Sequence, residues 1–460
     1  MRESKHRNRQ CAAAFPIAAA VLFLIAPLAV SAQISLSTAV ALAEQASPAV
    51  HAARANVEKA SAALAETKDA YIPSFVLGAS PGYAYGFPFG YPSLFNANSQ
   101  SLLLSFSQPD YIRAARQGVR SAQLGLKNTQ QQVALDVALA YAELDHDLRE
   151  IAALDQEKGY AQTLVDMEQR RISAGVDAGI DSLRAQLTSA QVNEKRIHLD
   201  NDANDMRLRL SHLTGLPAVG LTTVSSSIPA PPAVPSGSGI DELPPGNDPG
   251  VAAAYANAKS KIYTAFGDAR QSYRPLITFG AQYSLFEKFA DYTQYFPNNF
   301  QYNNIAIGAQ ITFPLFDASR RARARESAAD AAHALADADA ARDTLSEESQ
   351  SMRGAIRELA AQQRVAEISS QLAQAQLNAL ETQLANGSGT PGAQPVSPIQ
   401  AEQAHIDERQ RYEDMLDADF SLMKVELNLM RATGQLDAWI QSSLQPPAAP
   451  PTVGPAPQPH

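Results

Sequence analysis

Residues 248–275 read DPGVAAAYANAKSKIYTAFGDARQSYRP, and residues 47–73 read SPAVHAARANVEKASAALAETKDAYIP. Each stretch opens with a small polar residue before Pro, continues as an Ala-rich helical segment and closes with Tyr-x-Pro. A third landmark, Pro109 in the first copy and Pro314 in the second, follows each stretch at a similar distance. Self-similarity at a fixed offset is the signature of a repeated structural unit. The sequence therefore predicts a duplicated fold.

Between the second and third landmarks, the hydrophobic period changes from helical to alternating. In the second copy, apolar residues alternate with small or polar ones over residues 276–286 and 304–314, and a weaker version covers residues 74–80 and 101–108. A period of two predicts strands with one apolar face, and about ten residues suit a tilted strand in a membrane. The strands alone also fit two soluble hairpins. The positions expected to face lipid are Leu102, Leu104, Phe106, Ile277, Phe279, Tyr283, Ile305, Ile307 and Ile311.

Ala-rich helical segments flank each strand pair. The six predicted helices cover residues 37–70, 111–173, 181–213, 249–273, 318–385 and 398–440. In each copy the two shorter helices together match the long one, which would span about 100 Å. We therefore expect two short helices to stack end to end beside one long helix. Asp110 and Asp317 are predicted caps of the two long helices. The helices alone fit a long soluble coiled coil better, and the strands decide against it.

The composition excludes several classes of protein. The chain has 460 residues, a net charge of −10 and a single cysteine, Cys11, which rules out a disulfide scaffold. The acidic balance gives no support to nucleic-acid binding. After residue 32, no stretch approaches the roughly 20 apolar residues of a spanning helix. No HExxH motif or Cys/His cluster is present, so we expect no enzyme, no bound metal and no other cofactor.

One short run of polar residues invites a metal-site interpretation. Asp145, His146 and Asp147 are consecutive and lie in the middle of a predicted helix. Adjacent helix positions diverge in direction and do not face one another. The sequence therefore predicts a solvated face of the helix here and not a metal site.

The two ends and the middle of the chain differ from the repeats. Residues 1–32 have a basic start, an apolar run and a Val-Ser-Ala end, which predicts a cleaved secretory signal, with an uncleaved anchor helix as the alternative. Two segments are rich in Pro, one between the copies and one at the C-terminal end. The predicted organisation is a signal peptide (1–32), a first repeat (33–216), a linker (217–247), a second repeat (248–440) and a tail (441–460).

The duplicated helices, the Tyr-x-Pro before the strands and the Pro-Leu-Phe-Asp at 314–317 resemble the TolC family of outer-membrane efflux proteins, over about residues 36–440. The resemblance implies a mainly α fold with a small β part, built from two tandem repeats of long antiparallel helices plus a β-hairpin. It also implies a homotrimer whose twelve strands form a transmembrane β-barrel, continued by a periplasmic α-helical barrel. Four strands cannot close a barrel alone, which agrees with a trimer.

The resemblance further implies an exit duct of a tripartite efflux or type I secretion system. Its partners would be outer-membrane lipid, a periplasmic adaptor and an inner-membrane pump, with no nucleic acid. The duct would perform no chemistry, and drugs, metals, peptides and proteins all remain candidate cargo. The alternative from a different class is a soluble periplasmic coiled-coil scaffold or adaptor protein.

The resemblance places two helix reversals at the periplasmic tip of the tube. Glycine tolerates the backbone angles that such a reversal needs. The expected adaptor-docking residues are Arg171, Gly175, Val176, Gly179, Ile180, Asp181, Gly387 and Ile399. The expected residues of a tip constriction are Gln394, Gln400, Glu381 and Glu402.

Overall fold

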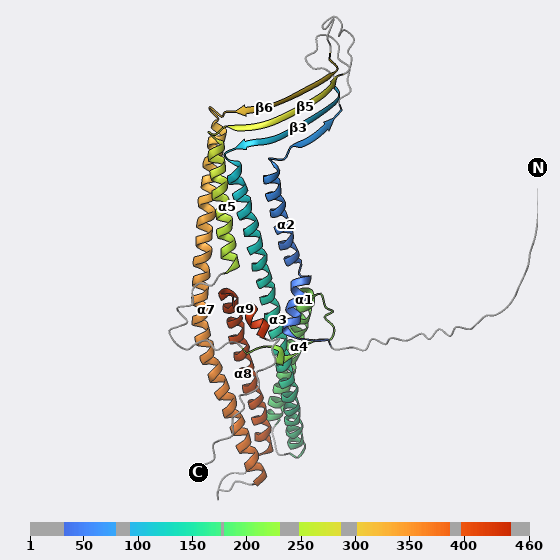
Figure 1. Ribbon diagram of the computed structural model, residues 1–460. Coiled ribbons are helices and arrows are strands. Elements are labelled where there is room, and N and C mark those ends of the chain that lie inside the picture. Colours follow the sequence, from blue (N-terminus) through green and yellow to red (C-terminus); the bar gives the residue numbers. More distant parts are fainter. Residues whose placement is uncertain are drawn as a thin grey trace, which may run out of the picture.

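The structure, a computed structural model, is an elongated wall of helices with a sheet at one end (Figure 1). It describes residues 32–79, 93–175, 179–230, 248–286, 301–386 and 397–442. The helices are α1 (Leu36–Ala46), α2 (Pro48–Asp69), α3 (Gln108–Ser173), α4 (Ile180–Thr214), α5 (Pro249–Gln271), α7 (Ala318–Asn386), α8 (Pro398–Thr433) and α9 (Leu436–Ser442). The strands are β1 (Ala32–Ile34), β2 (Ser74–Gly78), β3 (Ser93–Ser105), β4 (Leu221–Thr223), β5 (Leu276–Phe286) and β6 (Asn303–Thr312). The predicted mainly α fold with a small β part is confirmed.

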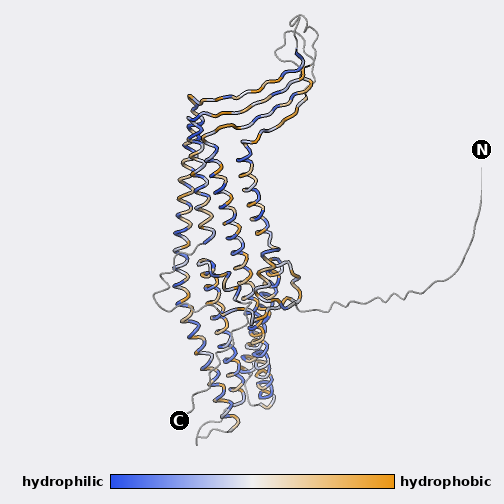
Figure 2. The backbone as a smooth tube through the Cα atoms, viewed as in Figure 1, coloured by the Kyte–Doolittle hydropathy of each residue, from blue (hydrophilic) through white to orange (hydrophobic). Residues whose placement is uncertain are grey.

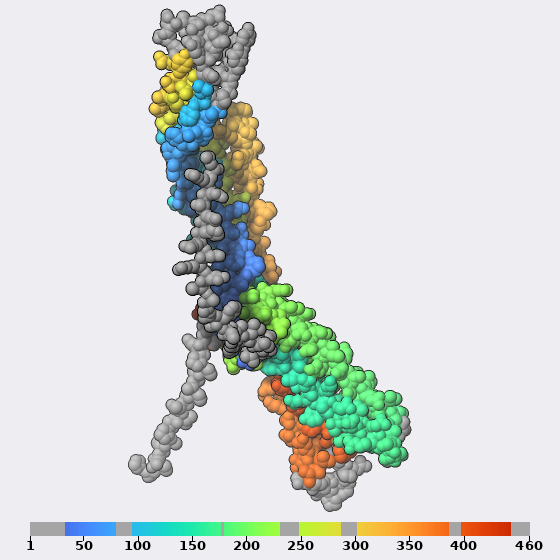
Figure 3. Space-filling model, turned by 90° about the vertical axis from the view of Figure 1, so that its right-hand side faces the viewer, coloured from blue at the N-terminus to red at the C-terminus, as the bar shows by residue number. Residues whose placement is uncertain are grey.

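Short helices stack along long ones, as the sequence predicts. In the half that carries the sheet, α2 and α5 pack on α3, and α5 also packs on α7. In the other half, α4 and α8 pack on α3, and α8 also packs on α7. Figure 3 shows that the wall is thin when turned by 90° and that the half with α4 (green) lies at an angle to the sheet-bearing half.

Two predicted helices are each divided in the structure. The segment predicted at 37–70 breaks at Ser47, whose extended backbone (φ −63°, ψ 124°) is the conformation that a following Pro imposes. The segment predicted at 398–440 breaks at Gly434, which has a φ of 74° and ends α8. Such a left-handed residue is a common helix terminator, and here it lets α9 turn away from α8.

The two predicted caps have different outcomes. Asp317 caps α7, because its Oδ1 accepts a hydrogen bond from the backbone N–H of Arg320 at 3.0 Å. Asp110 lies inside the first turn of α3, so the prediction that it caps this helix is wrong. The Asp110 side chain is buried and forms ion pairs with Arg113 and Arg270. It therefore ties the start of α3 to the end of α5.

The four long strands form one antiparallel sheet in the order β2-β3-β5-β6. β5 agrees with the predicted 276–286, whereas β3 begins at Ser93 and ends at Ser105 instead of covering 101–108. β3 begins earlier than predicted because of its pairing. Residues 93–100 are rich in Ser, Asn and Gln, but they pair with β5 along most of their length. A strand that pairs on both sides forms without a strong pattern of its own.

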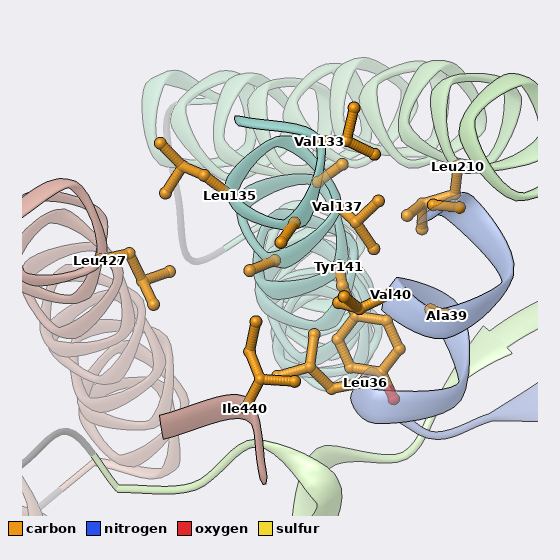
Figure 4. Packing of buried hydrophobic residues seen from close by; sticks show 14 of the residues in the cluster. Leu36, Ala39, Val40, Val133, Leu135, Val137, Tyr141, Leu210, Leu427 and Ile440 are labelled. Atoms are coloured by element: carbon orange, nitrogen blue, oxygen red, sulfur yellow. The ribbon is translucent and has the colours of Figure 1, made fainter. Parts of the chain in front are cut away.

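The main core lies near the middle of the wall, where α1, α4, β4, α8 and α9 meet α3 (Figure 4). Tyr141 of α3 is fully buried there, and its hydroxyl donates to the backbone oxygen of Ile34 at 2.7 Å and accepts from the backbone N–H of Val224 at 2.7 Å. Parallel strands β1 and β4 are thereby held against α3. Figure 2 shows hydrophobic positions gathered here and in the sheet.

Parts of the predicted organisation lie outside the described residues. The predicted signal peptide falls almost entirely in residues 1–31, and most of the tail falls in residues 443–460. The predicted linker is described as far as residue 230, and this part carries β4 and a short 3₁₀ turn at Ser225–Ser227. The domain boundaries therefore stay predictions.

Candidate functional site

One face of the sheet is apolar. Residues directly opposite one another in antiparallel strands share a face, so the register assigns each side chain to a side. Ile277 lies opposite Ile311, Ala281 opposite Ile307, and Tyr283 opposite Ile305. The apolar face is made of Phe75, Leu77, Phe95, Ala97, Leu104, Ile277, Phe279, Ala281, Tyr283, Ile305, Ile307, Ala309 and Ile311, with Ser99 and Ser101 among them. Ile305 and Ile307 are 70% and 69% exposed in the single chain.

The opposite face carries polar but uncharged side chains. Its members include Asn96, Asn98, Gln100, Thr278, Gln282, Ser284, Asn304, Gln310 and Thr312. Gly280 and Gly308 lie opposite each other at its centre, beside a hollow that Gln100, Gln282 and Gln310 help to line. Among the paired residues of these four strands, no ionisable side chain lies on this face. The sheet therefore separates an apolar environment from a polar one.

Leu102 departs from the predicted set of apolar-face residues. It lies opposite Thr278, on the polar face, whereas Leu104 lies opposite Ile277, on the apolar face. The register shifts between these two leucines, because Leu103 is an extra residue that forms a β-bulge. The prediction that Leu102 shares the face of Leu104 is therefore wrong. Phe106 follows the end of β3, where the guanidinium carbon of Arg274 lies 5.6 Å from its ring centroid.

The far ends of the helices surround a groove. A hollow of about 560 Å³ lies between the last turns of α3, the first turns of α4 and the start of α8. Four of the predicted tip residues line it: Arg171, Asp181, Ile399 and Gln400. The structure thus brings together residues from both halves of the chain, and the sequence distance between residues 181 and 399 hides this proximity.

The two glycines that flank residues 176–178 have the backbone conformation expected of them. Gly175 has a φ of 73° and Gly179 a φ of 83°, which are left-handed values that glycine adopts without strain. Ile180 follows at 60% exposure. Val176 lies outside the described residues, as do Gly387 and Gln394 of the second reversal.

The predicted constriction residues have individual partners within the chain. Gln400 caps α8, because its Oε1 accepts a hydrogen bond from the backbone N–H of Ser397 at 3.0 Å. Glu381 of α7 lies 3.4 Å from Nε2 of His405 on α8. Glu402 has one buried carboxylate oxygen without a hydrogen-bond partner among the described residues. A constriction between subunits stays a prediction.

The Asp145–Asp147 run is buried, so the predicted solvated face is wrong. All three side chains are buried, because α3 is covered on several sides by other elements. Asp145 accepts hydrogen bonds from Thr223 and Ser225 at 3.0 and 2.6 Å. Asp145 and His146 nevertheless diverge in direction, as expected, and meet different partners.

His146 is the centre of a charged contact between α3 and α8. Its Nε2 lies 3.4 Å from Glu150 and 3.2 Å from Asp417, and its ring stacks on Phe420 with centroids 4.8 Å apart. Burial alone would lower the pKa of His146, but its hydrogen bonds to Asp417 and Glu150 raise it to about 9. These three groups could in principle hold a metal ion. A protonated imidazole that donates to both carboxylates is a salt-bridge partner and not a ligand.

Two exposed stripes follow opposite edges of the wall. Each repeats at intervals of three and four residues, the spacing of a coiled-coil seam. The α4 stripe consists of Ile180, Leu183, Leu187, Ala190, Glu194 and Ile197, and the α7 stripe of Ala361, Val365, Ile368, Leu372, Ala375 and Ala379. All twelve are exposed, because α4 and α7 are the outer helices in this half of the wall. Large exposed apolar surfaces indicate contacts with a partner. Sequence reasoning missed these stripes, although their spacing was visible in it.

Among the described residues, no helix combines the length and the apolar composition that crossing a bilayer requires. The fold and its surfaces define a class instead: a long helical wall that carries an amphipathic sheet at one end. Known proteins and family models show which other chains share this architecture.

The family model of outer membrane efflux proteins matches residues 39–216, within the predicted first repeat. This match confirms, over residues 39–216, the resemblance to outer-membrane efflux proteins seen in the sequence, and the fold agrees with it. No curated protein matches the chain by sequence.

Solved structures of the same fold cover most of the chain. The outer membrane protein VceC of Vibrio cholerae is 17% identical, with a TM-score of 0.67, over 87% of this chain and 96% of that one. The CmeC outer membrane channel of Campylobacter jejuni is 15% identical, with a TM-score of 0.68, over 89% of each chain. The open state of the MtrE outer membrane channel of Neisseria gonorrhoeae is 15% identical, with a TM-score of 0.66, over 87% and 89%.

Proposed function

We propose that the protein is a homotrimeric exit duct in the outer membrane, through which cargo from an inner-membrane pump leaves the cell. The observation that carries the proposal is the two-faced sheet with unpaired edges. β2 and β6 each pair on one side only among the described strands, and unpaired strand edges cannot face lipid. Three copies joined β6 to β2 would close a barrel with the apolar face toward lipid and the uncharged face toward the lumen.

The helical wall supports the same assembly. The α7 stripe lies on the side of the wall that carries β6, and the α4 stripe lies beyond α3 on the other side. If β6 of one subunit pairs with β2 of the next, the α7 stripe meets the α4 stripe of that neighbour. Both stripes would then be buried in a seam of small and apolar side chains, with Glu194 as its one ionisable member. The result is a closed helical tube that extends into the periplasm.

The groove at the tips supports docking of a periplasmic adaptor. It combines apolar residues such as Ile399 with the charged side chains of Arg171, Asp181 and Arg184. A surface of this kind suits a helical partner whose apolar residues lie between charged ones. The tripartite arrangement, in which the adaptor joins the duct to its pump, follows from this docking.

Disulfide trapping tests the assembly. Ile197 on α4 and Ile368 on α7 lie at comparable distances from the tip end of their helices. In a background without Cys11, a chain with cysteine at both positions should form a covalent trimer in outer-membrane fractions under mild oxidation. Each single-cysteine variant is the matched control and should stay at the size of one chain on denaturing gels. Recovery of the double variant only as a soluble monomer would support the scaffold alternative and reject the duct.

A further inference from the structure

A buried group of charges joins α3, α4 and α8 away from the tip groove. Glu150, Glu157 and Glu413 are 3%, 1% and 2% exposed. The ammonium group of Lys195 lies 2.7 Å from Glu150 Oε1 and 2.9 Å from Glu413 Oε2. Burying a carboxylate is costly unless a cation or hydrogen bonds compensate its charge. One ammonium group for three buried carboxyl groups leaves a deficit of positive charge.

The neighbouring charges do not remove this deficit. From α3, the protonated His146 contacts Glu150, but it also contacts the carboxylate of Asp417 on α8. From α8, Arg411 lies 3.2 Å from the carboxylate of Asp414, at the rim of the same region. Lys195 from α4 and His146 from α3 thus face four carboxyl groups.

The Glu157–Glu413 pair is the place where a proton can supply the missing positive charge. The two carboxyl groups are within hydrogen-bonding reach of each other. Gln410 donates its side-chain N–H to Glu157 Oε1 at 2.9 Å, and Glu413 Oε1 is buried with no hydrogen-bond donor among the described residues. Ionised carboxylates only accept hydrogen bonds, so two of them can bond only when a proton lies between them. A hollow of about 300 Å³, lined by both groups and Lys195, connects the pair to solvent.

We propose that Glu157 and Glu413 share one proton at neutral pH and, together with Lys195, form a proton-dependent clamp that holds α8 against α3 and α4. Burial raises the pKa of both carboxyl groups, and the hydrogen bonds to Gln410 and Lys195 oppose this only in part. The folded chain therefore binds this proton more tightly than the unfolded chain does. The resulting stabilisation is complete below the ordinary pKa of Glu and is lost as the pH rises through the raised values.

Loss of the proton would loosen the part of α8 that leads to the tip. With the pair fully ionised, Lys195 and His146 would face four negative charges, two on α3 and two on α8. Repulsion would then act between α8 and the α3–α4 pair. The clamp lies within one protomer, so the inference does not rest on the proposed duct, and either can fail without the other.

Infrared spectroscopy of the purified full-length protein tests the shared proton. Ordinary carboxyl groups are ionised at about pH 7 and give no C=O band of the protonated acid. The wild-type protein should show such a band, and Glu413→Gln should lose about one carboxyl group of its intensity per chain. The matched control is Asp166→Asn, which removes an exposed carboxylate from α3 outside both stripes and should leave the band unchanged. Equal bands in the two folded variants, or no band in the wild type, would overturn the proposal.

A second measurement leaves the carboxyl pair intact. Spin labels at Gln186 on α4 and Gln403 on α8, both exposed and uncharged, report the separation of the helices between the clamp and the tip. The chain holds no cysteine other than Cys11, so labelling is specific once that residue is replaced. The distance within one subunit, diluted with unlabelled subunits, should lengthen from about pH 6 to about pH 9. A constant distance would contradict the clamp even if Glu413→Gln failed to fold.

Discussion

At the residue scale, the junction between helices and sheet depends on a glycine. A Cβ atom at Gly267 of α5 would lie 2.6 Å from Cε1 of Tyr111, so the aromatic ring occupies the space that glycine leaves. The hydroxyl group of Tyr111 donates to Asp268 Oδ1 at 2.6 Å. The close approach of α3 and α5 and this hydrogen bond therefore both require the glycine.

We predict that Gly267→Ala destabilises the protein by about 1–3 kcal/mol, the usual cost of overpacking, because the Tyr111 ring must move and its hydrogen bond weakens. Gly354 in α7 is the matched control, since a Cβ atom there would have no neighbour within 4 Å. Gly354→Ala should be neutral or stabilising by up to about 1 kcal/mol, the gain of alanine over glycine in a helix. Denaturant unfolding monitored by circular dichroism measures both, and equal effects would contradict the packing argument.

At the element scale, β6 separates two environments with adjacent residues. Ile307 lies on the apolar face opposite Ala281, and Ala306 lies on the polar face opposite Gln282. The two positions share one strand and the same depth. They therefore provide a test of orientation that strand propensity does not affect.

Ile307→Arg should cost about 2–4 kcal/mol if this face meets lipid at the middle of the bilayer, because a charge is then placed in hydrocarbon. Ala306→Arg should cost far less, since it would point into a water-filled lumen. The fraction of heat-sensitive trimer in outer-membrane fractions measures both variants. Similar assembly of the two variants would reject the assigned orientation and favour a soluble sheet.

At the scale of the whole molecule, the α7 stripe is predicted to lie between subunits. Ile368→Asp should bury an unpaired carboxylate in that seam and weaken each interface by about 3 kcal/mol. Gln374→Asp is the control, because Gln374 is exposed on the same helix but outside the stripe. Light scattering after size-exclusion chromatography measures the trimer fraction. Loss of trimer in the control, or none in Ile368→Asp, would place the subunit interface elsewhere.

The sequence by itself determined the duplication, the elements and their order. Those features depend on local period and on chain breakers, as with the alternation in β5 and Pro249 at the start of α5. It also placed Gly175 and Gly179 at a reversal, because positive φ angles favour one residue type.

Only the tertiary structure decided which residues from distant segments meet. The bulge at Leu103 sends Leu102 to the polar face, and the surrounding helices bury the Asp145–Asp147 run. The contact between Glu157 and Glu413 likewise arises from the packing of α3 against α8. The physical reason is that periodicity fixes which side of an element a residue takes, whereas register and packing fix what that side faces.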